Sequence, residues 1–195
     1  MSYLDKFNKE QQELLVSLPY RTGLLVSESD DEGGEDSAEA ELLTLESLIT
    51  GYAQDYIKSE FVEELMKKTL ASKDKWQDWS EGLDAVPDQC MSAVKVVEDM
   101  LDAKDTQSFR TSLMEISKAV AMAYREVEEE DLETTDKVKV YGQYYMDMLR
   151  AKLKSEPPPN MDEYLNISHS EREVLTKLSE ALQVDLEGNP YEGYV

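Results

Sequence analysis

Apolar residues recur along most of this chain three or four positions apart. The clearest stripe consists of Phe109, Leu113, Ile116, Val120, Tyr124 and Val127. Residues at this spacing share one face of an α-helix. The stripe predicts a long amphipathic helix whose N-cap is Thr106 and whose buried face carries Leu113, Ile116, Val120 and Tyr124.

Shorter stripes of the same kind predict further helices along the chain. They occupy residues 5–18, 42–56, 61–70, 94–101, 138–153 and 174–182. Ser59 precedes one stripe as an N-cap candidate, and Pro87 opens another, because proline is tolerated in the first turn of a helix. Pro19 predicts a helix start or a kink before the apolar run 20–26.

Two short motifs resemble capping boxes, in which a side chain before a helix and one three residues later satisfy backbone N–H groups. Ser168 and Glu171 form the better one, ahead of the last stripe. Asp36 and Glu39 form a similar pair ahead of the stripe 42–56. Both motifs predict helix starts.

No segment shows the apolar–polar alternation of a strand. The sequence therefore predicts an all-α protein, a single compact domain over residues 1–195 that bundles about seven or eight helices. Three non-helical segments interrupt or end it: an acidic loop at 27–37, a proline-rich connection at 155–166 and a polar tail at 185–195.

The charge balance narrows the choice of partners. Forty-three acidic residues face 20 lysines and arginines, so the net charge is −23. Such a surface repels the phosphates of nucleic acids and anionic membranes, and it attracts cations and basic protein surfaces. We expect no nucleic-acid partner. Solubility alone is the alternative interpretation of the charge.

Targeting signals and reactive groups are sparse. The first 15 residues lack the apolar run of a signal peptide, and no apolar stretch is long enough to span a membrane. Cys90 is the only cysteine, so no intramolecular disulfide forms, and its apolar surroundings predict a core position. These features predict a cytoplasmic protein.

The sequence contains no complete set of catalytic residues. His169 is the only histidine and lies in a predicted capping turn. Phosphate-binding glycine loops, zinc-binding histidine pairs and nucleophile elbows are missing. We therefore predict that the protein is not an enzyme. A carboxylate-based metal hydrolase is the alternative, which the missing Glu-x-x-His spacing disfavours.

Acidic residues crowd one segment. Residues 22–57 hold ten acids and no lysine or arginine: Glu28, Asp30, Asp31, Glu32, Glu35, Asp36, Glu39, Glu41, Glu46 and Asp55. A hard cation such as Ca²⁺ would relieve the repulsion, since it takes six to eight oxygen ligands. The segment is no EF-hand, because Glu35 stands where that loop needs glycine. The alternative is a solvated acidic loop.

Three short segments resemble the tellurite-resistance TerB-like family of helical domains. They are LMEISKAVAMAY at 113–124, ISHSEREVLTKLSEALQV at 167–184, and LLVSESDDEG at 24–33 followed by SAEAEL at 37–42. The resemblance implies an all-helical fold, a role in stress or metal resistance, and a divalent-cation site in the first acidic turn. Its ligands would be Asp30, Asp31, Glu39 and Glu41.

Together these features predict a non-catalytic acidic helical module. On the TerB-like interpretation it binds Ca²⁺ or another divalent cation and mediates protein interactions. The alternative is an acidic decoy or adaptor that binds a basic protein surface.

Overall fold

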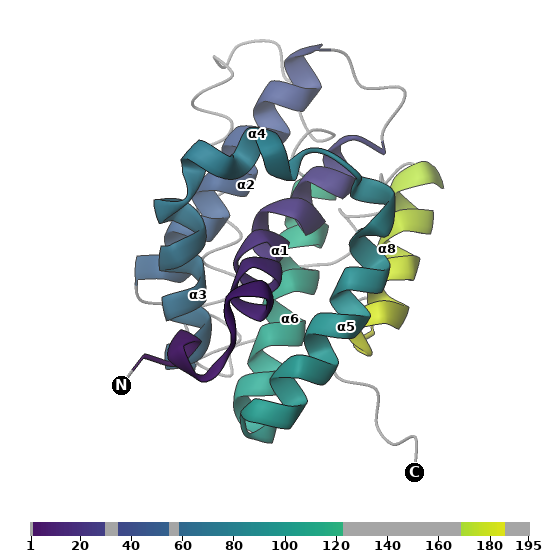
Figure 1. Ribbon diagram of the computed structural model, residues 1–195. Helices are drawn as coiled ribbons and strands as arrows, with labels where there is room; N and C mark the ends of the chain where they lie inside the picture. Colours follow the sequence, from purple (N-terminus) through teal and green to yellow (C-terminus); the bar gives the residue numbers. More distant parts are fainter. Residues whose placement is uncertain (1, 30–34, 55–58, 123–168, 186–195) are drawn as a thin grey trace, which may run out of the picture.

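The computed structural model describes residues 2–29, 35–54, 59–122 and 169–185 (Figure 1). Several sequence-based predictions lie outside these residues. They include the stripe 138–153, the proline-rich connection 155–166, Tyr124, Val127 and nearly all of the polar tail.

The described chain is helical throughout, which confirms the all-α prediction. Seven α-helices are described: α1 (Lys9–Ser27), α2 (Glu35–Gln54), α3 (Glu60–Ala71), α4 (Trp76–Trp79), α5 (Val86–Met100), α6 (Ala103–Ala121) and α8 (His169–Leu182). Three 3₁₀-helices, η1 (Leu4–Lys6), η2 (Lys73–Lys75) and η3 (Leu83–Ala85), join them. No β-strand occurs within the described ranges.

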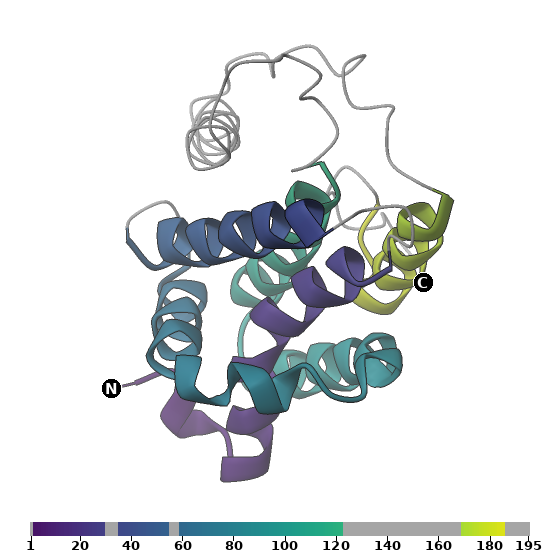
Figure 2. The same ribbon diagram turned by 90° about the horizontal axis from the view of Figure 1, so that it is seen from above.

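The helices pack as a bundle around α1. It contacts α2, α3, α5, α6 and α8, and its most extensive contact is with α6. Seen from the side and from above, α2 and α3 flank this central pair on one side, and α5 and α8 flank it on the other (Figures 1 and 2). Within the described residues, no helix is long and apolar enough to cross a membrane.

The central stripe of the sequence forms the core face of α6. Phe109, Leu113, Ile116 and Val120 are all 0% exposed, as predicted. The predicted N-cap at Thr106 is wrong. Asp102 has the extended backbone of a cap, and its carboxylate accepts the N–H of Asp105 at 2.8 Å.

Helix α1 is continuous through Pro19, so the proline neither starts a helix nor ends one. Proline has no N–H to donate, and the Leu15 carbonyl therefore loses its usual helical partner. Every residue from Leu15 to Leu24 is buried. An all-round buried surface is expected of a helix with neighbours on all sides.

The close approach of α1 to α2 depends on a glycine. A Cβ atom at Gly23 would lie 2.4 Å from Cδ1 of Leu45, closer than carbon atoms approach without a bond. The absence of that atom lets the Leu45 side chain, which is 0% exposed, fill the space between the helices.

Other predicted boundaries are confirmed or shifted. Ser59 caps α3 by accepting the Val62 N–H at 3.3 Å, and Pro87 stands in the first turn of α5. α2 begins at Glu35, so residues 35–37 belong to a helix rather than to the acidic loop, and Asp36 is not its N-cap. On the predicted apolar face of α8, Leu175, Leu178 and Leu182 are buried, and Val174 is partly buried.

The core position of Ile116 yields a stability prediction. Replacing Ile116 with Asp would bury an unpaired carboxylate and lower the free energy of unfolding by about 4 kcal/mol or more. Urea denaturation followed by circular dichroism measures the change. The matched control is Gln107→Asp, at an exposed position of α6. An Ile116→Asp variant as stable as this control would contradict the core assignment.

Candidate functional site

The predicted cation ligands fall at the edge of the described chain. Asp30 and Asp31 lie outside the described residues, and Glu39 lies in α2 with its side chain outside them. Glu41 also lies in α2, and it is 2% exposed.

Elsewhere, the described residues contain no group of three or more histidine, cysteine, aspartate or glutamate side chains placed to hold a metal ion. Cys90 lies on α5 and is 0% exposed, which confirms its predicted core position. His169 begins α8, with its side chain outside the described residues. The cation site at 30–41 thus stays a prediction.

Acidic side chains from two helices gather at one end of the bundle. We call this the acidic pole, formed by Glu60 and Glu64 of α3 and by Asp102 and Asp105 at the start of α6. Both helices begin at this end, near the N-terminus of the chain (Figure 1). Carboxylates are favourable there, because the positive end of a helix dipole lies at its N-terminus.

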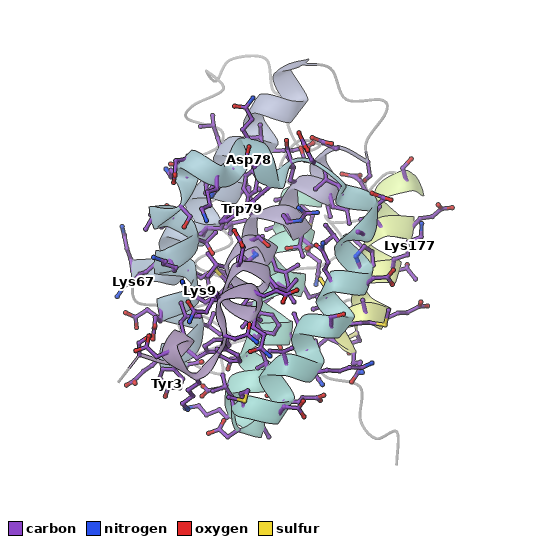
Figure 3. All side chains as sticks on the ribbon, in the orientation of Figure 1. Tyr3, Lys9, Lys67, Asp78, Trp79 and Lys177 are labelled. Carbon is purple, nitrogen blue, oxygen red and sulfur yellow. The ribbon has the colours of Figure 1, made fainter. Side chains whose placement is uncertain are left out.

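The pKa of Tyr3 responds to the negative charge of the acidic pole. Its phenol has a raised pKa, chiefly because of Asp105, then because of burial, and then because of Glu60, Asp102 and Glu64. Negative charge near a phenol disfavours its ionised form. Four carboxylates therefore act together on one aromatic side chain, at the end of the bundle opposite Asp78 (Figure 3).

Two of these carboxylates also fix the helix starts. Ser59 Oγ donates to Asp105 Oδ1 at 2.8 Å, and the same serine caps α3. Asp102 caps α6. Asp105 is 8% exposed, whereas Glu60 and Asp102 are exposed. The exposed pair is available to a positively charged partner.

A second polar feature lies inside the bundle. Arg21 of α1 is 8% exposed, and its Nη2 donates to the Gly82 carbonyl at 2.8 Å. Burial lowers the pKa of its guanidinium, and Asp84 and then Cys90 oppose that effect. Gly82 has a left-handed backbone, with φ of 62°. Arg21 thus holds the turn before α5 against the central helix.

Neither the acidic pole nor Arg21 is predicted from the sequence. Charges counted along the chain reveal only acids that are close together in sequence, whereas the pole combines residues about 40 positions apart. The signal for Arg21 was present: it is the only charged residue within the otherwise uncharged run 20–26.

Comparisons with protein-family models, curated proteins and solved structures find no match for this chain.

Burial of Cys90 yields a reactivity prediction. Burial raises the pKa of its thiol to about 12, although Arg21 opposes the shift. The thiolate is the reactive form, so at pH 8 the folded protein should react with a disulfide reagent only as fast as it opens. We expect full labelling in concentrated guanidinium chloride. The control is Cys90→Ala with Ser92→Cys, which moves the thiol to an exposed position on α5. Equally fast labelling of the two folded chains would contradict burial.

Proposed function

We propose that the protein is a non-catalytic helical module that binds a positively charged segment of another protein. The acidic pole is the observation that carries this proposal, because the starts of α3 and α6 meet there through the Ser59–Asp105 hydrogen bond and bring four carboxylates to one end of the bundle, where they raise the pKa of Tyr3. Negative charge beside an aromatic ring suits lysine and arginine side chains, which are attracted to both.

The distribution of basic residues supports the proposal. Lys67, Lys73 and Lys75 lie near one another in sequence, but each pairs with an acid: Glu63, Glu46 and Glu13, respectively. These lysines are thus neutralised locally. The net charge of −23, which already counts these lysines, steers cationic partners toward the surface over long distances.

The acidic pole yields a binding prediction. A lysine-rich peptide without aromatic residues should bind, and binding should weaken as salt increases, because ions screen exposed charges. The variant Glu60→Gln with Asp102→Asn should weaken binding by about 2- to 30-fold, since an exposed charge pair contributes about 0.2–1 kcal/mol. Asparagine also caps helices well, so α6 should keep its start. Fluorescence anisotropy of a labelled peptide measures the affinity.

The matched control is Asp74→Asn with Asp78→Asn, which removes the same charge from two exposed positions in η2 and α4. Equal weakening in both variants would show that the peptide responds to the overall charge and not to the acidic pole. Duplex DNA at about 150 mM salt serves as the anionic control, and we expect no gel shift.

A second candidate function is divalent-cation binding by residues 28–41. Ten acids without a base between residues 22 and 57 favour it, as does the resemblance to TerB-like domains. The buried position of Glu41 favours Asp30, Asp31 and Glu39 as the ligands. On this proposal the module acts in stress or metal resistance, and an ion would fix α2 relative to the end of α1.

Calorimetry tests the cation site. We expect one saturable Ca²⁺ site with a dissociation constant of about 10⁻⁴–10⁻³ M, because the segment lacks the glycine that makes an EF-hand loop rigid. Asp30→Asn with Asp31→Asn should abolish binding. The variant Glu60→Gln with Asp102→Asn should retain it, since it changes only the acidic pole. Loss of binding in the second variant and not in the first would place the ion at the pole.

A further inference from the structure

The N-terminal segment Ser2–Phe7, which we call the strap, lies across aromatic residues of the core. Leu4 is 7% exposed and Phe7 is 4% exposed. The rings of Tyr3 and Phe7 lie 6.1 Å and 5.9 Å from the ring of Phe61. Phe61 in turn lies 6.1 Å from Phe109 of α6. The strap therefore covers an apolar floor.

Two side chains hold the strap by polar contacts. The Glu64 carboxylate accepts hydrogen bonds from Ser2 Oγ, from the Tyr3 N–H at 2.8 Å and from the Leu4 N–H at 3.3 Å. Gln12 Nε2 donates to the carbonyls of Leu4 at 2.8 Å and Phe7 at 2.9 Å. The strap thus binds as a short peptide would, through backbone groups and apolar anchors.

Helix α1 does not need the strap in order to begin. Asn8 Oδ1 accepts the Gln11 N–H at 2.9 Å, and Gln11 Oε1 accepts the Asn8 N–H at 3.0 Å. This reciprocal capping box fixes the helix start directly after Phe7. The strap is able to detach at that point while α1 stays formed, because short segments outside the core helices open locally at a lower free energy than the core.

The chemistry of the strap matches its surroundings. It offers three apolar anchors, Tyr3, Leu4 and Phe7, together with a lysine. Lys6 Nζ lies 5.0 Å from the centre of the Tyr3 ring. The anchors meet the apolar floor, and the lysine lies over the ring of Tyr3, whose phenol the acidic pole influences.

We infer that the strap is a built-in occupant of a binding groove, and that the groove accepts an aromatic, lysine-bearing segment of a partner protein when the strap detaches. This inference rests on the proposed function and names its binding surface, where the partner's own aromatic and lysine side chains take the places of Tyr3 and Lys6. The strap then acts as an autoinhibitory contact. A partner binds only the open form, in which the strap is detached. The apparent affinity for the partner therefore falls as the fraction of molecules with the strap in the groove rises.

Peptide binding to the full chain tests the inference. The probe is a fluorescent peptide with the sequence of residues 2–9, SYLDKFNK. A strap variant, Tyr3→Ala with Leu4→Ala, keeps the groove and weakens its built-in occupant. We expect this variant to bind the probe about tenfold or more tightly than the wild type, because the open fraction rises. Adding Glu64→Ala should remove binding, since the acceptor of the backbone N–H groups is lost.

The control peptide carries Lys6→Glu and Phe7→Ala and should not bind. Equal affinity of the wild type and the strap variant for the probe would overturn the inference, as would binding that survives Glu64→Ala. If the lysine-rich peptide binds and the strap peptide does not, the inference fails and the proposed function stands. If neither binds, both fail. A wild-type dimer formed by exchange of straps would assign the groove to a second copy instead.

Hydrogen exchange tests the same inference on the wild-type chain, so the result does not depend on whether a variant folds. The amides of Tyr3 and Leu4 report the strap, and the amides of α6 report the core. We expect the strap amides to exchange at least about tenfold faster than those of α6, through local opening. Equal protection of both sets would show that the strap leaves only on global unfolding, and would overturn the inference.

Discussion

Burial of α1 on every side from Leu15 to Leu24 is the constraint on which the other helices depend. A surrounded helix has to satisfy its polar groups inside the protein, because an unpaired buried group is costly. Thr22 donates to the Leu18 carbonyl at 3.0 Å, and Thr69 of α3 donates to the Val16 carbonyl at 2.7 Å. Arg21 reaches the Gly82 carbonyl. These bonds tie α3 and the turn before α5 to specific positions along α1.

The same arrangement decides where the acidic pole forms. The connection between α5 and α6 is short, so the two helices run in opposite directions and α6 begins beside the N-terminal segment (Figure 1). α3 begins at the same end. Two helix starts therefore meet at one place. Each of them needs hydrogen-bond acceptors for its free N–H groups. Acidic residues satisfy that need and concentrate negative charge there.

Local sequence patterns predicted the local structure well, but they did not predict contacts between residues that are far apart in sequence. The stripe from Phe109 to Val120, the cap at Ser59 and the proline at the start of α5 depend on neighbours within a few positions. Thr106 was a plausible cap by type, but Asp102 stands where the chain turns. The bond from the Tyr3 N–H to Glu64 joins residues 61 positions apart, and helical periodicity carries no information on such a pair.

The acidic pole also limits what is able to replace the strap. Three of its carboxylates, Glu60, Asp102 and Asp105, lie at helix starts, where the helix dipoles offset part of their charge. Glu64 lies further along α3, and its described hydrogen bonds come from the strap. If the strap detached, water would hydrate this half-buried carboxylate, and the aromatic floor beside it would become exposed. A replacement must therefore bring backbone N–H donors for Glu64, an apolar anchor for Phe61 and positive charge for the surrounding field. An extended protein segment meets all three needs at once, whereas a metal ion or a purely basic peptide meets only some of them.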